Sequence, residues 1–575
     1  METGHFKSFD QNDIFYRVWN YNVNKKSLVI IHRGHEHSER LNDFAKNDIF
    51  EKYNIFSYDL RGHGYTKTDS SPKMMDYVRD LEFFIRFIKE KYKIDEKDIF
   101  FVANSIGGVI ATTWLSYYTP HIAGMALLAP AFEIKLYIPL AEKFIKLFTK
   151  IKSKAKVPSY VKSKVLTHDT KEQEKYDQDR LITKDINAKL LLDVLEFGKR
   201  TAKDSSIETP MIIFSAQKDY VVKNAAQRDF FINIESLSKE FVPLENFYHG
   251  IIFEEKREKV YEKLENFIIK SFNEEKREIN ILPNRDSLRE YDTILVNKIS
   301  KWEEISFKTQ KFLLKKLGWL SNGMDIGLKH GFNSGPSLDY IYKNKPRGKY
   351  FIGKLLDKFY LKQVGWKGIR ERKENLLKLV RDKINSNSNR EIKILDVAGG
   401  VGNYLFDIKN EFPHAKIVIN EFKMENIALG EQIIRNNNWE DIVFTNYDCF
   451  LLETYDKIKF DPDIVIISGI FELFSDNKLL DNTIKGVSKI LKENGCIIYT
   501  GQPYHPQHHQ IAYVLNSYNG EDWIMRIRSQ QELDNLFFSN GFSKKETLMD
   551  DNGIFTVSLV ERRNNNGNIR LQIKE

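Results

Sequence analysis

The sequence contains little cysteine and no long apolar segment. Its 575 residues include only two cysteines, Cys449 and Cys496, and no Cys-x-x-Cys pair. Neither a disulfide framework nor a thiolate zinc site is therefore expected. The first residues lack the apolar core of a signal peptide, and no run reaches the roughly 20 residues of a membrane-spanning helix. These absences favour a cytoplasmic protein without a bound metal.

The charge balance argues against one class of partner. The formal net charge is +8, 29% of the residues are charged and 42% are hydrophobic. This composition is that of a soluble globular protein. So small a positive excess over this length does not indicate a nucleic-acid-binding protein. The chain is too long for a single hydrophobic core, so two or more domains are expected.

A serine at the end of an apolar run is the first candidate for chemistry. Residues 98–104 are predicted to form a buried strand, and small residues after Ser105 begin a helix. A sharp turn between strand and helix pushes a serine hydroxyl out of the sheet towards a base, as a nucleophile requires. In the Gly-x-Ser-x-Gly pattern of such turns, Ala103 takes the first glycine position and Gly107 keeps the second. Ser105 is therefore the candidate nucleophile, although a plain strand-to-helix turn has the same pattern.

Strand and helix patterns alternate around this serine, as in an α/β fold with a mostly parallel sheet. Residues 27–32 and 54–60 are predicted strands, followed by a histidine-rich loop at 32–40 and a second loop at 59–64. Open α/β sheets bind ligands at the carboxyl ends of their strands. The histidines of these loops either serve such a site or are held by local hydrogen bonds.

Together, residues 32–40, residues 59–64 and the turn at Ser105 resemble the lysophospholipase and monoacylglycerol lipase branch of the α/β-hydrolase fold. The resemblance covers about residues 1–275. It implies that the backbone N–H groups of Gly34 and Ile106 form an oxyanion hole, where each donor lowers the barrier by about 3 kcal/mol. Arg33 stands where this branch usually has glycine.

A hydrolase of this kind needs an acid and then a histidine, each after a later strand. A predicted strand at 209–218 ends at Asp219, and His249 follows the next strand pattern. Ser105, Asp219 and His249 thus occur in the chain order of this fold. We predict that Ser105 attacks, that His249 acts as base and then acid, and that Asp219 orients the imidazole.

An insertion at about residues 131–206 is predicted to form a helical lid. Its segment 134–148 mixes aromatic and aliphatic residues with lysines. Such a basic amphipathic segment suits an anionic lipid surface. A lid whose lysines are merely solvated fits the pattern equally well. Between residues 141 and 165 a single acid, Glu142, stands against Lys143, Lys146, Lys150, Lys152, Lys154, Lys156, Lys162 and Lys164.

The chain changes character after residue 272. A charged run at 274–278 and a stretch with proline and turn residues at 280–286 mark a boundary. We expect a hydrolase domain at 1–275, a linker and helical extension at 276–390, and a second α/β domain at 391–575.

The second domain opens with a glycine-rich turn. A predicted strand ends at Asp396, and Gly400 and Gly402 lie at the start of the next helix. Glycines at this place let the backbone approach a nucleotide closely. A dinucleotide fingerprint would require a further glycine where this chain has Leu405. The pattern resembles instead the first motif of Rossmann-like class I S-adenosylmethionine-dependent methyltransferases, with Ala398 in place of its first glycine.

Acids also follow the next two predicted strands. Glu421 follows the second strand and is placed to accept hydrogen bonds from both ribose hydroxyls. Asp448 follows the third, and the resemblance places it at the adenine amino group. A fourth strand leads to residues 470–476, where the methyl acceptor should approach. The predicted S-adenosyl-L-methionine site comprises Asp396, Ala398, Gly400, Gly402, Glu421 and Asp448.

Three histidines near the end of the chain are not explained by these motifs. His505, His508 and His509 could ligate a metal, but a surface cluster is the interpretation we favour.

Further sequence blocks resemble a bacterial family in which a hydrolase and a methyltransferase share one polypeptide. This resemblance covers nearly the whole chain and implies a bifunctional enzyme of lipid metabolism. Its expected substrates are a small-molecule or lipid ester and a separate methyl acceptor. We also expect peripheral contact with the anionic inner membrane face through the lid, and no nucleic-acid partner. The blocks lie at 128–137, 318–323, 335–340, 365–370, 468–474, 499–506 and 553–558.

Two alternatives stay open. The same triad serves thioesterases and peptidases, because a fold does not fix the leaving group. The hydrolase half could also be a binding module attached to an active methyltransferase.

Overall fold

The computed structural model divides into two compact units, Met1–Arg277 and Glu278–Glu575. Residues 275–298, where the sequence predicts the boundary and linker, lie outside the described residues. So do the lid lysines Lys152 and Lys154 and the side chain of Lys150. The described residues are 1–21, 26–68, 71–138, 140–151, 155–204, 206–274, 299–386 and 391–563.

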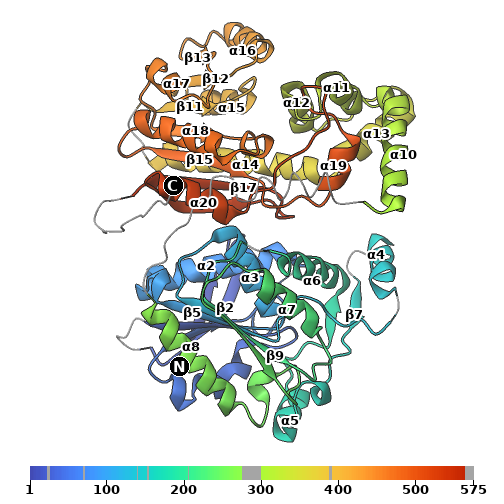
Figure 1. The fold of residues 1–575 in the computed structure, drawn as a ribbon, viewed down its shortest axis with the longest axis vertical. Coiled ribbons are helices and arrows are strands. Elements are labelled where there is room, and N and C mark those ends of the chain that lie inside the picture. Colours follow the sequence, from blue (N-terminus) through green and yellow to red (C-terminus); the bar gives the residue numbers. More distant parts are fainter. Residues whose placement is uncertain are drawn as a thin grey trace. The chain divides into compact units, whose positions relative to one another are not determined.

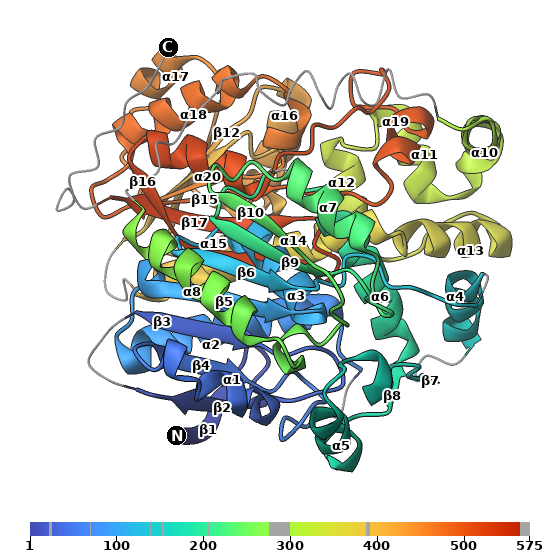
Figure 2. The same cartoon turned by 60° about the horizontal axis from the view of Figure 1, so that its bottom comes forward.

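The first unit is built on an eight-stranded sheet in the order β1-β2-β4-β3-β5-β6-β9-β10 (Figures 1 and 2). β1 pairs with β2, and β2 with β4, in antiparallel fashion. All pairs from β4 to β10 are parallel, as the alternating pattern predicts. The strands are β1 (Glu2–Lys7), β2 (Asp13–Trp19), β3 (Ser27–Ile31), β4 (Asn54–Tyr58), β5 (Ile99–Asn104), β6 (Gly124–Leu128), β9 (Met211–Ala216) and β10 (Lys239–Leu244).

Helices cover both faces of this sheet. Neighbouring residues of a strand point to opposite faces. In β5 the ring centroid of Phe100 lies 6.2 Å from that of Phe267 in α8, whereas that of Phe101 lies 5.1 Å from Trp114 in α3. The central strand that leads to Ser105 is thus clamped from both sides. The helices are α1 (Asn42–Ala45), α2 (Met74–Tyr92), α3 (Ile106–Tyr118), α4 (Ala141–Ile151), α5 (Thr170–Gln178), α6 (Ala188–Thr201), α7 (Asn224–Asn233) and α8 (Glu258–Asn273).

The segment between β6 and β9 contains α4, α5 and α6 and a small antiparallel sheet of β7 (Lys156–Pro158) and β8 (Asp185–Asn187). Two histidines of the loop 32–40 hold this insertion. His37 Nε2 lies 2.8 Å from Asp179 Oδ2, and His35 Nδ1 lies 3.2 Å from Thr183 Oγ1. The local hydrogen-bond interpretation therefore applies to both histidines.

The second unit is built on a seven-stranded sheet in the order β13-β12-β11-β14-β15-β17-β16 (Figure 1). Only β17 runs antiparallel to its neighbours. The chain moves outward in one direction from β11 and in the other from β14, and such a reversal opens a ligand crevice at the carboxyl ends of the strands. The strands are β11 (Lys393–Val397), β12 (Lys416–Asn420), β13 (Ile442–Thr445), β14 (Ile464–Ile467), β15 (Cys496–Gly501), β16 (Phe542–Met549) and β17 (Thr556–Arg562).

Two hydrophobic cores sandwich this sheet. Ile394 and Ile464 belong to one core, and their neighbours Leu395 and Val465 to the other. This alternation fits strands buried on both faces. The helices around the sheet are α15 (Asn403–Glu411), α16 (Met424–Asn437), α17 (Leu452–Lys457), α18 (Asn477–Ile490) and α20 (Gln530–Ser539). The helix α19 (His508–Val514) packs instead against α10 (Lys301–Leu317).

A helical extension precedes this sheet and lies beside it (Figure 1). A third hydrophobic core of the second unit joins Phe332 and Trp366 of the extension to Trp523 and Phe555 near the end of the chain. The extension therefore belongs to the second unit. Its helices are α10 (Lys301–Leu317), α11 (Asn322–His330), α12 (Gly335–Lys343), α13 (Tyr350–Leu361) and α14 (Val364–Ser386).

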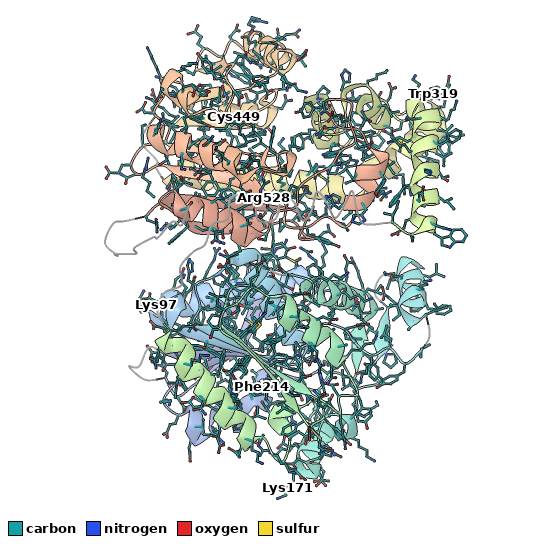
Figure 3. The ribbon with its side chains drawn as sticks, viewed as in Figure 1. Lys97, Lys171, Phe214, Trp319, Cys449 and Arg528 are labelled. Atoms are coloured by element: carbon teal, nitrogen blue, oxygen red, sulfur yellow. The ribbon has the colours of Figure 1, made fainter. Side chains whose placement is uncertain are left out.

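The side chains divide into buried and exposed sets as expected. Phe214 lies inside the first unit, whereas Lys97 and Lys171 lie at its surface (Figure 3). Cys449 and Cys496 are buried and unpaired. Among the described helices, none combines the length and apolar character needed to cross a membrane.

Candidate active sites

The turn between β5 and α3 holds Ser105 in a strained conformation. Its φ of 52° lies in the left-handed region that residues with a side chain rarely adopt. Gly107 is required by close packing, because a Cβ there would lie 2.9 Å from the carbonyl oxygen of His32. Ala103, by contrast, fits inside β5, where it is fully buried. The departure from the usual glycine at position 103 thus leaves the turn intact.

The structure brings the three predicted triad residues together. His249 Nε2 lies 2.8 Å from Ser105 Oγ, and His249 Nδ1 lies 2.7 Å from Asp219 Oδ2. All three side chains are buried. A hydroxyl, an imidazole and a carboxylate thus form one hydrogen-bonded chain, an arrangement that serine hydrolases use.

The backbone holds Asp219 in its charged form. Its Oδ1 accepts hydrogen bonds from the N–H groups of Val221 at 2.6 Å and Val222 at 2.9 Å. Burial alone would raise the pKa of Asp219, but His249 and these N–H groups keep the pKa below its ordinary value. A charged Asp219 can therefore orient His249 and stabilise its protonated form.

The two predicted oxyanion-hole residues lie side by side. A Cβ on Gly34 would lie 3.5 Å from Ile106 Cγ2. Ile106 begins α3, where the first N–H groups have no acceptor within the helix. The side chain of Arg33 is buried and donates to Glu36 at 2.6 Å. Arg33 therefore fits this loop as half of a buried ion pair.

His32, in the same loop, is occupied by the backbone. Its Nδ1 lies 2.8 Å from the carbonyl oxygen of Arg33, and its Nε2 accepts from the N–H of Leu60 at 3.0 Å. Burial lowers the pKa of His32 to about 4. His32 is thus a neutral structural residue.

The second site is a cavity of about 410 Å³ at the carboxyl ends of β11 to β14. Five of the six predicted cofactor residues line it: Ala398, Gly400, Gly402, Glu421 and Asp448. The cavity lies where the strand order reverses, which is the expected ligand position in an open α/β sheet. The structure therefore gathers these five residues around one space.

The glycine-rich turn and Glu421 are joined. The N–H of Gly400 donates to Glu421 Oε2 at 2.8 Å, and the N–H of Lys423 donates to Oε1 at 2.8 Å. Gly402 has a φ of 81°, which glycine adopts without strain. Glu421 is thus fixed in place, with lone pairs remaining on both oxygens for a ligand hydroxyl.

Asp396, the sixth predicted residue, does not line the cavity but lies beneath it. A Cβ on Gly399 would lie 2.5 Å from Asp396 Oδ2. That oxygen accepts a hydrogen bond from the Tyr404 hydroxyl, whereas Oδ1 is buried and has no partner in the described part of the chain. Burial and the nearby charge of Glu421 raise the pKa of Asp396 to about 8. The residue is therefore uncharged at neutral pH.

The helical extension supplies part of the same cavity, which the sequence motifs did not predict. Asn333, Ser334, Tyr342 and Arg372 line it. Gly335 and Leu338, which also line it, belong to the block at 335–340, which predicted kinship and no ligand contact. A turn block of this kind outside the main sheet was the one available signal.

His505 contradicts the predicted surface cluster. Its side chain is buried and lines a second cavity, and its Nδ1 accepts from the N–H of Gln507 at 3.1 Å. Burial lowers the pKa of His505 to about 3. His508 is half-buried, and its Nε2 lies 2.7 Å from the carbonyl oxygen of Met525. Sequence spacing cannot reveal this burial, because the covering residues come from distant helices.

Two family models match the two halves of the chain. One, described as "Serine aminopeptidase, S33", matches residues 22–256, and one described as "Putative methyltransferase" matches residues 264–562. The uncharacterized protein YnbC of Escherichia coli is 33% identical over 97% of this chain and 98% of its own length. The chain belongs to this family. It combines an S33-type α/β-hydrolase domain with a methyltransferase domain, as the sequence resemblance predicts.

Other relatives match the first half alone. Phospholipase YtpA of Bacillus subtilis is 22% identical over 42% of this chain and 93% of its own length. The monoglyceride lipase homolog of Monkeypox virus is 25% identical over 47% of this chain and 98% of its own length. A solved structure of Saccharomyces cerevisiae monoglyceride lipase with a substrate analog covers 48% of this chain and 96% of its own, at 19% identity and a TM-score of 0.42.

Proposed function

We propose that the chain is a bifunctional enzyme of lipid metabolism: a serine ester hydrolase of the lysophospholipase or monoacylglycerol lipase type, and an S-adenosyl-L-methionine-dependent methyltransferase. The chain of hydrogen bonds from Ser105 through His249 to Asp219 carries the first part of this proposal. Two relatives named as a phospholipase and a monoglyceride lipase homolog support an ester of a glycerol lipid as substrate.

Hydrolysis follows from the triad geometry. His249 Nε2 takes the proton of Ser105 as Oγ attacks the ester carbonyl. The N–H groups of Gly34 and Ile106 hold the oxyanion, and His249 then gives its proton to the leaving alcohol. Water, activated by His249, attacks the acyl group and releases Ser105. Asp219 keeps the imidazole oriented throughout.

A fluorophosphonate probe tests this assignment. The full chain should be labelled at Ser105, and Ser105→Ala should remain unlabelled. A chain whose hydrolase half only binds ligands would stay unlabelled as well. Rates on a p-nitrophenyl ester, a thioester and a peptide anilide separate the esterase from the thioesterase and peptidase alternatives, and we expect the ester to react fastest.

The second site suits S-adenosyl-L-methionine. Glu421 keeps free lone pairs for the ribose hydroxyls. Asp448 lines the same cavity and is available to the adenine. The left-handed turn at Gly400 and Gly402 leaves room for the methionine part of the ligand. When bound, the cofactor would supply an electrophilic methyl group. The residues of the chain then bind it, orient it and exclude water.

Calorimetry tests the cofactor. S-adenosyl-L-methionine should bind the full chain, and NAD should not. Binding of NAD with no binding of S-adenosyl-L-methionine would refute the methyltransferase half.

The lid helix α4 supports peripheral contact of the hydrolase with anionic membranes. Its Phe144 is 63% exposed and Leu147 is 59% exposed, and Tyr137 just before it is exposed as well. Such side chains enter an interface while lysines meet the headgroups. Phe144→Ser with Leu147→Ser should slow hydrolysis of lipid in anionic vesicles yet spare a soluble ester. Equal losses on both substrates would indicate that the lid covers the active site without contacting the membrane.

A further inference from the structure

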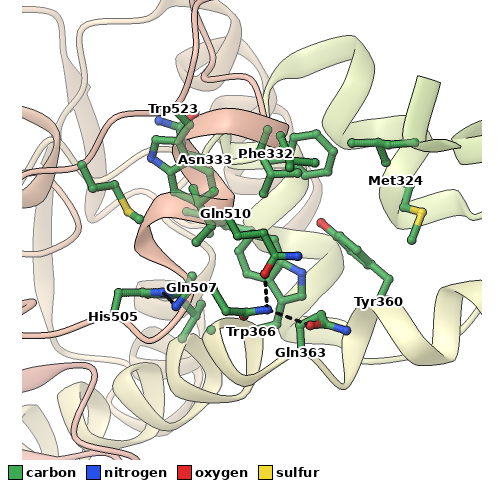
Figure 4. Close-up of a pocket in the computed structure, with 18 of the residues that line it drawn as sticks. Met324, Phe332, Asn333, Tyr360, Gln363, Trp366, His505, Gln507, Gln510 and Trp523 are labelled. Atoms are coloured by element: carbon green, nitrogen blue, oxygen red, sulfur yellow. Dashed lines mark hydrogen bonds between the residues drawn. The ribbon is translucent and has the colours of Figure 1, made fainter. Parts of the chain in front are cut away.

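The second unit contains a larger, mostly apolar cavity of about 530 Å³ (Figure 4). Helices α10, α13, α14 and α19 contribute to its walls. Cavities of about 300–1,000 Å³ with such walls take drug-sized apolar ligands. Aromatic and aliphatic side chains dominate the lining, among them Leu314, Met324, Phe332, Tyr360, Trp366 and Trp523.

This cavity adjoins the cofactor cavity. A ligand at its inner end would therefore lie next to the group that the cofactor delivers. The residues that line both cavities are Asn333, Leu338, Arg372, Gly469 and Leu473.

The inner end carries an incompletely paired carboxylate. Arg372 Nη1 donates to Glu472 Oε1 at 2.9 Å, and both side chains are buried. Glu472 is 9% exposed, and its second oxygen, Oε2, has no partner among the described residues. The Tyr360 hydroxyl and the Trp523 indole N–H in the same walls also lack partners there (Figure 4). Buried polar atoms of this kind cost free energy unless a ligand pairs with them.

The outer end reaches the surface. Phe359 lines the cavity although its side chain is 66% exposed, and Leu313 and Leu317 line it while nearly half exposed. Exposed apolar side chains around an opening of this kind mark a contact with a partner or a membrane. We call the following exposed apolar residues of α10 and α13 the apolar rim: Leu313, Leu317 and Phe359, which line the cavity, and Phe351, Ile352 and Leu355, which precede Phe359 on α13.

Basic residues accompany the apolar rim. On α13, the positions 351, 355 and 359 form an apolar row, and the positions 354, 358 and 362 continue as a neighbouring row of lysines. The one acid of this stretch, Asp357, is buried and accepts from Ser321 Oγ at 2.6 Å. An apolar row beside a basic row is typical of helices that lie in anionic membrane interfaces. The exposed bases between residues 343 and 362 are Lys343, Lys345, Arg347, Lys349, Lys354, Lys358 and Lys362.

We propose that the methyl acceptor is a neutral membrane lipid with a small hydroxyl or amine head, which enters from an anionic bilayer through the apolar rim and reaches Glu472. The inference rests on the proposed methyltransferase function. The apolar walls accept the hydrocarbon of such a lipid. A phosphodiester head would meet those walls and the carboxylate of Glu472, both of which disfavour it.

The transfer step balances with the residues present. The acceptor donates its O–H or N–H hydrogen bond to Glu472 Oε2, which directs a lone pair of the acceptor towards the methyl carbon. A bond from oxygen or nitrogen to that carbon forms as the carbon–sulfur bond breaks, and the electron pair of that bond stays on sulfur. The acceptor proton passes to Glu472 and then to solvent, and S-adenosylhomocysteine is released. Arg372 holds the carboxylate in place.

Radiolabelled methyl transfer into vesicles tests the proposal. The probe is S-adenosyl-L-methionine with a labelled methyl group, given to the full chain with phosphatidylglycerol–phosphatidylcholine vesicles that carry neutral lipids extracted from Escherichia coli. Label is expected in the neutral-lipid fraction, and phosphatidylcholine-only vesicles should accept less. Label confined to phospholipid, to water-soluble products or to protein would overturn the proposal.

Variants of the apolar rim locate the entry. Phe351→Ser with Leu355→Ser should reduce the label at least about tenfold, because two apolar side chains no longer enter the bilayer. The matched control, Leu429→Ser with Val443→Ser, removes exposed apolar residues elsewhere in the same unit and should leave the label unchanged. Equal label in both variants would overturn entry through the rim.

Cavity variants separate this inference from the proposed function. Leu356→Trp should fill the cavity, and Glu472→Gln should keep the hydrogen bond from Arg372 while removing the base, which is worth about 10²-fold or more. Both should bind S-adenosyl-L-methionine as the unaltered chain does. If both variants transfer the full amount of label, the proposed acceptor site is wrong, whereas the proposed methyltransferase function is unaffected. If the unaltered chain does not bind S-adenosyl-L-methionine, the proposed methyltransferase function itself is wrong.

Discussion

The two candidate sites differ in how complete they are without a ligand. In the hydrolase unit, Ser105, His249 and Asp219 form an unbroken chain of hydrogen bonds. In the methyltransferase unit, Asp396 Oδ1 and Glu472 Oε2 are buried without partners among the described residues. The triad pairs its own polar side chains, whereas the other site leaves buried polar atoms that a ligand can satisfy.

Chemistry explains the difference. Ester hydrolysis draws its nucleophile, base and oxyanion donors from the chain, so these groups must be aligned in advance. In methyl transfer the reactive group arrives with a cofactor, and the chain mainly supplies a shaped and charged surface. The two sites should therefore respond differently to single substitutions.

Removal of the nucleophile should have the largest effect. Ser105→Ala should lower ester hydrolysis by about 10⁴-fold or more, because the remaining triad and oxyanion donors cannot form the acyl-enzyme. The rate on a medium-chain p-nitrophenyl ester measures this. Ser116→Ala, on the same helix, should keep the full rate, and cofactor binding should be unchanged in both. A near-normal rate in Ser105→Ala would rule out the assigned nucleophile.

A cofactor-site substitution should cost less. Glu421→Ala should weaken S-adenosyl-L-methionine binding by about 1–3 kcal/mol, or roughly 10- to 100-fold, because a charge-assisted hydrogen bond to the ribose is lost. The turn at Gly400 also loses its anchor. Titration calorimetry gives the change in Kd, with Glu425→Ala as the exposed control. An unchanged Kd in Glu421→Ala would place the ribose elsewhere.

Asp396 should make cofactor binding depend on pH. Its pKa is raised to about 8, so the carboxyl group is protonated in the free protein below that pH. A positively charged ligand in the cavity above Asp396 stabilises the carboxylate and lowers its pKa, so binding releases a proton. The affinity for the cofactor should rise with pH and level off near pH 8. The total rise should be about tenfold for each unit by which binding lowers the pKa of Asp396. Calorimetry between pH 6 and 8.5 should show this slope, and Asp396→Asn should flatten it.

The same raised pKa affects stability in the opposite direction. The folded form holds the Asp396 proton more tightly than the unfolded form does. The contribution of this group to the free energy of unfolding is therefore full below the pKa of about 3.9 in the unfolded chain, and it is lost as pH rises to about 8.

Sequence reasoning reached the parts of the sites that lie on central strands. Ser105 and Asp219 each follow a buried apolar run, where strand patterns are strongest. The antiparallel hairpin of β1 and β2 was not predicted, because the edge strand β1 is mostly exposed and buries only Phe6 fully, so it has no clear apolar pattern. The helical walls around Tyr342 and Arg372 were also missed. Nothing local to those residues shows that they line the cavity at the end of β14.

The burial of Asp396 shows the same limit. Its position after β11 predicted contact with the cofactor, whereas Gly399 lies over it. Depth below a surface depends on how a turn folds back, and a linear pattern does not contain that information.

The smallest expected effect concerns backbone strain, which both sites share. Ser105 has a φ of 52° and Ala398 a φ of 60°, each in the turn after a central strand. At Ser105 the strained residue is the proposed nucleophile, whereas the Ala398 side chain has no polar group to offer. Ala398→Gly should remove a left-handed penalty of about 1–2 kcal/mol and add about 0.5–1 kcal/mol of backbone entropy cost. The net gain in the free energy of unfolding should be at most about 1.5 kcal/mol in denaturant titrations, with the Kd for the cofactor unchanged. A clear loss of stability or of cofactor affinity would show that the alanine methyl group itself shapes the site.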